Sequence, residues 1–167
     1  MKTLILVRHA KSGWDNPDWI DFERPLNKRG LRDAPFMGNI LKEKGILPDL
    51  IISSSANRAI TTARAYAQAF DYKESDIRQD INIYEKGTRH IINTIKSVPN
   101  NVGTLMIFGH NPDITSLCTY FSGEYIDNVP TSGTVCIDFD IDLWDKVEER
   151  NGKLRFFEFP KKYKGKK

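Results

Sequence analysis

The feature that most limits the possible folds is a short segment near the start of the chain, Thr3–Val7, in which every residue is β-branched or apolar. A continuous run of this kind is typical of a parallel strand that is buried on both faces of a sheet. The run ends in Arg8-His9, not in the small residues of a signal-peptide cleavage site, so we interpret it as a strand. No apolar run approaches the roughly 20 residues that span a membrane, so we expect no membrane partner and, by default, a cytoplasmic location.

After this strand, segments with strand and helix patterns alternate through the first two thirds of the chain. Strands are expected at 50–53, 77–80 and 104–108. Helices are expected between Asn27 and Gly45, and at 57–70, 88–97 and 113–121. The last third adds strands at 134–139 and 154–159, joined by a turn at Asn151-Gly152. The pattern predicts an α/β fold, a three-layer α/β/α sandwich with a mostly parallel central sheet and an antiparallel edge strand.

Residues 1–160 contain no repeat, linker or low-complexity segment, so we expect a single domain there. Residues 161–167 form a basic tail, which carries much of the net charge of +3 and which we expect to be frayed. The rest of the chain lacks the basic stripe with interleaved aromatics that binds nucleic acid, so no nucleic-acid partner is expected. We expect Cys118 and Cys136 to be buried free thiols. The histidines are scattered and no paired Cys or His spacing is present, so we expect no metal and no cofactor.

Three of the expected strands end in residues that suit a bound phosphate. The first ends in Arg8-His9, the second is followed by Arg58 at the start of a helix, and strand 104–108 is followed by His110. Parallel strands present their carboxyl ends at one edge of the sheet, where α/β proteins bind ligands. Helix starts at that edge add backbone N–H donors. We therefore predict a pocket for a dianion, and interpret His90, which lies within an expected helix, as structural or solvated.

Three segments resemble the motifs of the histidine phosphatase (phosphoglycerate-mutase-like) superfamily. Residues 6–12 match its Arg-His signature, residues 53–63 its second-arginine motif, and residues 109–112 its second-histidine motif. They occur in the family's order and spacing, and the likeness extends over nearly the whole chain.

Further segments, at 24–27, 29–35 and 48–54, are similar to the SixA-type phosphohistidine phosphatases of that superfamily. Phosphoglycerate mutases carry longer insertions that cap the site, for which this chain has little room. The resemblance thus implies an open cleft and, as partner, a phosphorylated protein such as a histidine-containing phosphotransfer domain. The alternative is a phosphatase for small phosphate esters. A non-catalytic phosphate-binding module is disfavoured because every catalytic residue type is present.

The resemblance implies a metal-independent phosphatase in which His9 attacks phosphorus and forms a phosphohistidine intermediate. For this reaction His9 must be neutral, with its second ring nitrogen donating to a backbone carbonyl. Arg8 and Arg58 hold phosphoryl oxygens with two-pronged hydrogen bonds, and His110 adds another donor. These groups stabilise the charge of the transferring phosphoryl group.

The proton donor is an open point of this interpretation. An acidic residue after the third strand protonates the leaving oxygen in the superfamily, and Glu85 occupies about that position. The alternative is an exposed carboxylate that pairs with Lys86 or Arg89. Some SixA-type members lack an acid here, since imidazole leaves phosphohistidine more readily than an alkoxide leaves an ester. A role for Glu85 thus depends on the substrate.

Candidate substrate-binding residues follow the nucleophile and the second histidine. Many superfamily members have a phosphate-binding asparagine six positions after the nucleophile, but this chain has Asp15 there and Asn16 next to it. Because a carboxylate repels phosphate, either Asn16 takes the role or the loop runs differently. Ser12 can donate to phosphate or to the loop, and Asn111 is a further candidate. We expect Arg24 to anchor the following proline rather than line the cleft.

Overall fold

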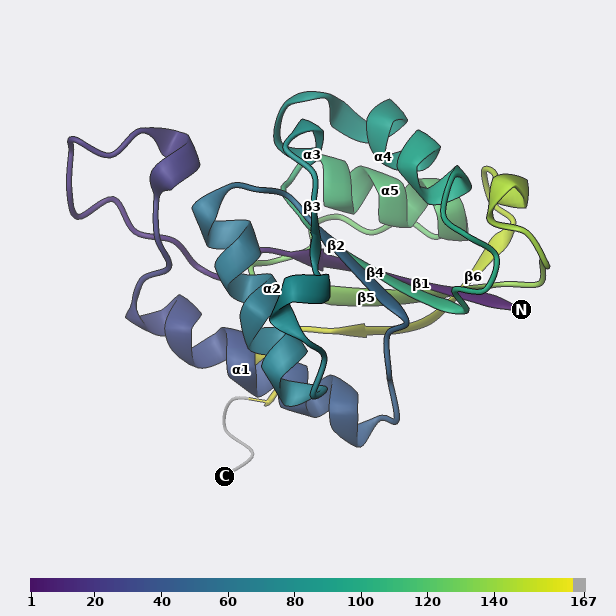
Figure 1. Ribbon diagram of the computed structural model, residues 1–167, viewed down its shortest axis with the longest axis horizontal. Helices are drawn as coiled ribbons and strands as arrows, with labels where there is room; N and C mark the ends of the chain where they lie inside the picture. Colours follow the sequence, from purple (N-terminus) through teal and green to yellow (C-terminus); the bar gives the residue numbers. More distant parts are fainter. Residues whose placement is uncertain (164–167) are drawn as a thin grey trace.

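The computed structural model describes residues 1–163, and its centre is a six-stranded sheet with the strand order β3-β2-β4-β1-β5-β6 (Figure 1). The strands are β1 (Lys2–Arg8), β2 (Leu50–Ser53), β3 (Arg78–Gln79), β4 (Thr104–Gly109), β5 (Thr134–Phe139) and β6 (Gly152–Glu158). The first four are parallel, β5 runs antiparallel to β1, and β6 runs antiparallel to β5. The predicted α/β fold with a mostly parallel sheet is thus confirmed.

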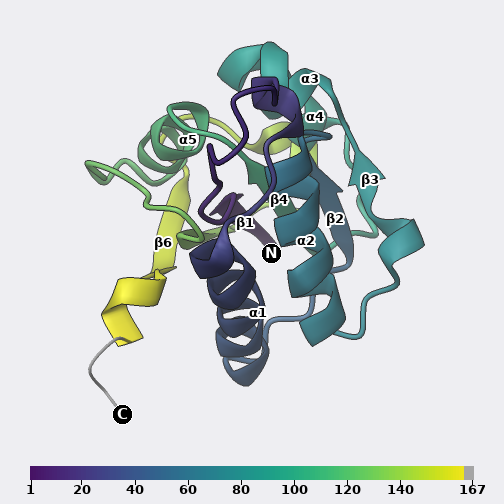
Figure 2. The same cartoon turned by 90° about the vertical axis from the view of Figure 1, so that its left-hand side faces the viewer.

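Helices cover both faces of this sheet (Figures 1 and 2). One layer contains α1 (Lys28–Glu43) and α2 (Asn57–Ala69), and the other contains α3 (Asn82–Glu85), α4 (Gly87–Lys96) and α5 (Asp113–Ser122). Short 3₁₀ helices are η1 (Asp21–Glu23), η2 (Glu74–Asp76), η3 (Trp144–Lys146) and η4 (Pro160–Tyr163). None of the helices in residues 1–163 has the length and apolar composition needed to cross a membrane.

The alternating side chains of β1 connect the two layers. Leu4 and Leu6 lie in the apolar cluster with α4 and α5, whereas Ile5 and Val7 lie in the cluster with α1 and α2. All four side chains are fully buried. Burial contributes roughly 1.5–3 kcal/mol for each side chain of this size, so both layers depend on this strand. The two cysteines belong to these clusters as buried free thiols, as expected.

Both ends of α1 follow the sequence signals. The side chain of Asn27 caps the start by accepting a hydrogen bond from the N–H of Gly30 at 2.9 Å. After the helix, Gly45 adopts a φ of +82°, a left-handed conformation that glycine tolerates best. Pro35 lies inside the helix, which nevertheless runs as one element from Lys28 to Glu43.

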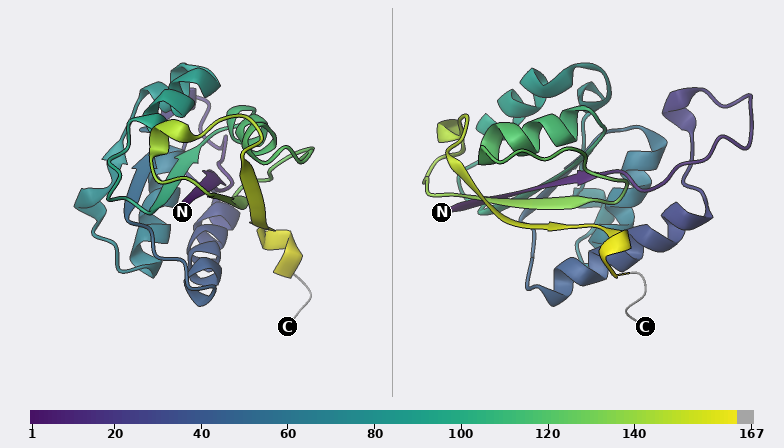
Figure 3. Two further views of the ribbon diagram at one scale, coloured as in Figure 1. Left: turned by 90° about the vertical axis from the view of Figure 1, so that its right-hand side faces the viewer. Right: turned by 180° about the vertical axis from the view of Figure 1, so that it is seen from behind.

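The connection between β1 and α1 projects from the carboxyl end of β1 and includes η1 (Figure 1 and the right view of Figure 3). Ser12 and Leu26 form an antiparallel bridge at its base. The N–H of Gly13 also donates to the carbonyl of Pro25 at 3.1 Å. We call residues 13–25 the η1 loop; backbone hydrogen bonds close it where it leaves the sheet.

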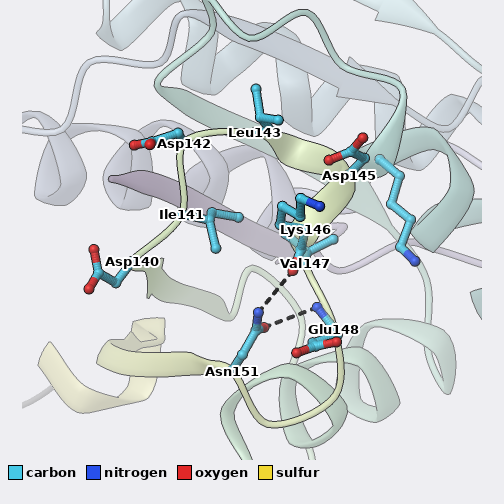
Figure 4. A pocket seen from close by; sticks show the side chains of 10 residues that line it. Asp140, Ile141, Asp142, Leu143, Asp145, Lys146, Val147, Glu148 and Asn151 are labelled. Carbon is cyan, nitrogen blue, oxygen red and sulfur yellow. Dashed lines mark hydrogen bonds between the residues drawn. The ribbon is translucent and has the colours of Figure 1, made fainter.

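At the opposite end of the sheet, residues 140–151 connect β5 to β6. The expected turn at Asn151-Gly152 lies at the start of β6, but η3 and its flanking residues separate the strands, so they do not form a tight hairpin. The segment borders a pocket with several carboxylates (Figure 4). Asn151 accepts from the N–H of Glu148 and donates to the carbonyl of Lys146, which braces the segment.

Part of the expected basic tail is ordered against β6. Residues 161–163 belong to η4, and Lys162 forms an ion pair with the buried carboxylate of Glu158 at 2.8 Å. Tyr163 also donates a hydrogen bond to Glu158. These three residues are therefore packed rather than frayed, while residues 164–167 lie outside the described part of the chain.

The close contact between Gly30 and the backbone of Lys11 yields a prediction about stability. A Cβ atom added at Gly30 would lie 2.1 Å from the carbonyl oxygen of Lys11, so one of the two segments must move. We expect Gly30→Ala to lower the free energy of unfolding by about 2–3 kcal/mol in urea denaturation. The control is Gly13→Ala, where the nearest atom is 3.5 Å away, with an expected change of less than about 1 kcal/mol. Equal stabilities of the two variants would contradict this prediction.

Candidate active site

The residues expected to bind phosphate meet at the carboxyl ends of β1, β2 and β4, the end of the sheet that faces the viewer in Figure 2. Arg8 pairs with Gly109 in the β1–β4 register, and the N–H of His9 donates to the carbonyl of Gly109 at 3.1 Å. This backbone pairing places His9 and His110 next to each other, with ring centroids 5.3 Å apart. The structure thus brings Arg8, His9, Arg58 and His110 together at this edge of the sheet.

The ring of His9 is buried and held in one orientation. Its Nδ1 lies 2.7 Å from the carbonyl oxygen of Ala10. A carbonyl only accepts, so we assign the ring proton to Nδ1, which leaves the lone pair on Nε2. Burial lowers the pKa of His9 to about 3; the nearby charges of His110, Arg58 and Arg8 act in the same direction, and the bond to Ala10 opposes them. The imidazole is therefore neutral at pH 7 and can act as a nucleophile.

Arg58, near the start of α2, lies beside His9 Nε2. Its Nε donates to His9 Nε2 at 3.4 Å. Its two terminal nitrogens point to Asp21: Nη1 donates to the carbonyl at 2.7 Å and Nη2 donates to Oδ2 at 3.0 Å. Arg8 approaches from β1, and its Nη1 donates to the carbonyl of Val129 at 3.1 Å. The two guanidinium groups thus have different partners, and of the two only Arg58 forms an ion pair with a carboxylate within residues 1–163.

His110 is fixed by the hydroxyl of Ser54, which lies 2.8 Å from its Nε2. The Ser54 oxygen accepts from the N–H of Ala56, and its hydroxyl proton has no other acceptor among residues 1–163, so we assign this proton to His110 Nε2 and the ring proton to Nδ1. Burial and the charge of Arg58 lower the pKa of His110 to about 4. At neutral pH this ring is an uncharged donor through Nδ1.

Three buried polar atoms near His9 lack a hydrogen-bond partner among residues 1–163: Arg8 Nε, His110 Nδ1 and Ser132 Oγ. The N–H of Ser132 donates to the carbonyls of Arg8 and His9, which places this residue against the segment that carries His9. A buried donor without a partner costs roughly 1–3 kcal/mol. An oxyanion supplies acceptors for all three, so this cluster has the chemistry of a phosphate site.

Asp21 and Tyr84 contact the site through side chains that the sequence did not single out. The Oδ2 of Asp21 accepts from Tyr84 Oη at 2.6 Å as well as from Arg58, and its Oδ1 accepts from Arg24 Nη1 at 2.9 Å. Partial burial raises the pKa of this carboxyl, but the hydrogen bonds from Tyr84, Arg24 and Arg58 outweigh it and hold the pKa well below its usual range. Tyr84 also places its ring edge against His110, with centroids 5.4 Å apart.

The structure does not join Glu85, the expected proton donor, to this cluster. Glu85 is exposed at the end of α3, and its side chain forms no hydrogen bond or ion pair with another residue of the described chain. Its neighbour Tyr84 contacts the site instead. The role of Glu85 stays a prediction.

The remaining candidates, Ser12, Asn16 and Asn111, form hydrogen bonds that fix loop segments. Ser12 Oγ accepts from Arg24 Nη2, and Arg24 also stacks on the ring of Trp14. This arginine therefore contacts residues other than the following proline, which we expected it to anchor. Asn16 Oδ1 accepts from a backbone N–H in the same loop. Asn111 Nδ2 donates to the carbonyl of Val129, the acceptor that Arg8 also uses.

Neither Asp15 nor Asn16 forms a hydrogen bond with His9, Arg8, Arg58 or His110 within residues 1–163. His90 pairs with Asp80 at 2.7 Å, which agrees with the expected structural role.

Comparison with known proteins shows which family, relatives and solved structures this chain is similar to. Residues 4–89 match the family model of the histidine phosphatase superfamily, branch 1. An uncharacterized chloroplastic protein of Arabidopsis thaliana is 34% identical over 134 residues, which cover 75% of this chain and 61% of that protein. A phosphoglycerate mutase of Bifidobacterium longum is 34% identical over 87 residues, which cover 50% of this chain and 35% of that protein.

Two solved structures share the fold over nearly their whole length. A protein assigned as the phosphohistidine phosphatase SixA of Agrobacterium tumefaciens is 27% identical, with a TM-score of 0.80 and coverage of 95% of this chain and 98% of that chain. The protein histidine phosphatase SixA in complex with tungstate has a TM-score of 0.83 at 19% identity and covers 97% and 99% of the two chains. At that identity, the second likeness concerns the fold.

The low pKa values of His9 and His110 predict a loss of stability in mild acid. Below pH 6.5 the unfolded chain binds protons that the folded chain does not, so the free energy of unfolding falls as the pH drops toward 4. We expect His110→Gln to reduce the difference in stability between pH 7 and pH 5 by about 1–2 kcal/mol, because one of the two groups is removed. Urea denaturation at both pH values measures this effect. An unchanged difference would show that protonation of His110 is not linked to unfolding.

Proposed function

Because this chain belongs to branch 1 of the histidine phosphatase superfamily, we propose that it hydrolyses phosphorylated substrates through a phosphohistidine intermediate on His9. The observation that carries this proposal is the state of the His9 ring. Its Nδ1–H is donated to the carbonyl of Ala10, and its unprotonated Nε2 lies against Arg58 Nε. A neutral, oriented imidazole beside a guanidinium is what attack on a phosphoryl group requires.

In the first step, His9 Nε2 attacks phosphorus in line and the bond from phosphorus to the leaving atom breaks. The electron pair of that bond goes to the leaving atom. Arg8 Nε, His110 Nδ1 and Ser132 Oγ are buried donors without another partner in the described part of the chain, and we assign them to the phosphoryl oxygens. In the second step, water attacks phosphorylated His9, which releases inorganic phosphate and restores the neutral imidazole.

We propose protein phosphohistidine as the substrate. The carboxylate that touches Arg58 is Asp21, and its hydrogen bonds keep it ionised, so it has no proton to give to a leaving group. Glu85 is not joined to the cluster. An alkoxide leaving group needs an acid, whereas imidazole carries its proton on the second ring nitrogen. The likeness to SixA-type structures agrees with this assignment.

A phosphatase for small phosphate esters is the second candidate. It is favoured by the position of Glu85, which directly follows Tyr84 in the helix whose tyrosine contacts His110. In this alternative Glu85 protonates the leaving oxygen.

The nucleophile can be tested by trapping the intermediate. We expect the wild-type protein to form an acid-labile phosphoenzyme from a phosphorylated histidine-containing phosphotransfer domain. His9→Ala should form none and lose at least about a thousandfold in turnover, because the covalent route is removed. The matched control is His90→Gln, a histidine paired with Asp80 outside the cluster, which should form the intermediate normally. Labelling of the His9→Ala variant to the wild-type level would disprove His9 as the nucleophile.

A second experiment separates the two substrate classes. We expect Glu85→Gln to leave phosphohistidine hydrolysis within about twofold of wild type, because the leaving imidazole needs no acid. The measurement is kcat/KM for a phosphohistidine protein and for a small alkyl phosphate. A tenfold or greater loss on the ester, together with little turnover of phosphohistidine by the wild type, would favour the ester phosphatase.

A further inference from the structure

Asp21 lies on the solvent side of the guanidinium that contacts the nucleophile. Arg58 reaches His9 Nε2 through its Nε and reaches Asp21 Oδ2 through Nη2, so one guanidinium group spans the two residues. His9 is 7% exposed, whereas the side chain of Asp21 is 42% exposed. A substrate enters from the solvent side, and its leaving group stays there during in-line attack. Asp21 is thus on the side of the departing group.

The carboxylate of Asp21 can accept one more hydrogen bond. An ionised carboxylate offers about four acceptor positions. Two on Oδ2 are taken by Arg58 and Tyr84, and one on Oδ1 is taken by Arg24. These three donors fix both oxygens in place and keep the group ionised. One acceptor position on Oδ1 is left for a substrate.

We propose that Asp21 is a specificity-determining residue that accepts a hydrogen bond from the N–H of the leaving imidazole of phosphohistidine. This inference rests on the proposed function, since it names the group that selects among phosphorylated substrates at the same site. The contact favours a leaving group that is protonated on its second nitrogen, and it gives nothing to a leaving group that lacks an N–H.

The chemistry of the step balances without an added acid. The substrate imidazole carries phosphorus on one nitrogen and a proton on the other, and in this form the ring is cationic. His9 Nε2 forms a bond to phosphorus, the phosphorus–nitrogen bond of the substrate breaks, and its electron pair stays on the departing nitrogen. The product is a neutral imidazole that keeps its original proton. A fixed carboxylate next to that N–H stabilises the cationic form and so raises the fraction of substrate that can react.

A purely structural role for Asp21 makes a different prediction. If the carboxylate only positioned Arg58, its loss would reduce turnover of every phosphorylated substrate by the same factor. If Asp21 contacts the leaving group, its loss penalises substrates with an N–H donor and spares the others. The two readings can therefore be separated by a ratio of two activities in one enzyme preparation, which partial misfolding does not change.

The test compares phosphoimidazole with 4-nitrophenyl phosphate, whose leaving group needs no acid and has no N–H. We expect Asp21→Asn to lower the ratio of kcat/KM for phosphoimidazole to that for the aryl ester by about tenfold, the effect of a charge-assisted hydrogen bond. We also expect the alkaline limb of the kcat profile for phosphoimidazole to move to lower pH by about one unit, since kcat reports the pKa of the bound complex.

The matched control is Glu23→Gln, which neutralises another carboxylate of η1. The Glu23 side chain forms no hydrogen bond or ion pair with another residue of the described range, and we expect its ratio to stay within twofold of wild type. An equal loss on both substrates in Asp21→Asn, with an unmoved alkaline limb, would overturn the role of Asp21 and leave the proposed function intact. Failure of the wild-type protein to cleave phosphoimidazole and a phosphohistidine protein would overturn both.

Discussion

The parallel pairing of β1 with β4 determines where His9 and His110 lie. The pairing continues one residue beyond the strands, through the hydrogen bond from the His9 N–H to the carbonyl of Gly109. Since His110 follows Gly109 directly, the two rings are brought together by backbone geometry and not by contacts between side chains. The central position of β1 protects this register, because its apolar side chains anchor both helical layers.

Within this backbone arrangement, the carboxylate of Asp21 offsets part of the positive charge of the site. Burial keeps both histidines neutral, which suits one as a nucleophile and the other as a donor. The positive charges of Arg8 and Arg58 remain, and Asp21 offsets part of them on the solvent side. The inner part of the site therefore attracts a phosphoryl group, while its outer part presents a fixed negative charge.

The fold could be predicted from the periodicity of apolar residues. The meeting of Arg8, His9, Arg58 and His110 at one edge of the sheet could be predicted from the order of the strands. Apolar segments such as Thr3–Val7 indicate buried strands, and the residues after parallel strands must meet at one edge. Asp21 and Tyr84 could not be found in this way, since Asp21 lies in a short 3₁₀ helix within a loop and Tyr84 lies in a single helical turn. The signal that was present is the Asp21-x-x-Arg24 spacing, which forms an ion pair across η1. Glu85 was placed by its order along the chain, which cannot tell which of two neighbouring side chains faces the site.

The structure of the η1 loop affects how the sequences of proteins with this sheet can diverge. No residue of η1 is buried, and the loop is closed at its base by the Ser12–Leu26 bridge and a backbone hydrogen bond. It adds a charged group to the site without adding side chains to the core. Insertions or exchanges in this loop can therefore alter which phosphorylated compound is accepted while the sheet still folds, so substrate preference and folding stability can evolve separately.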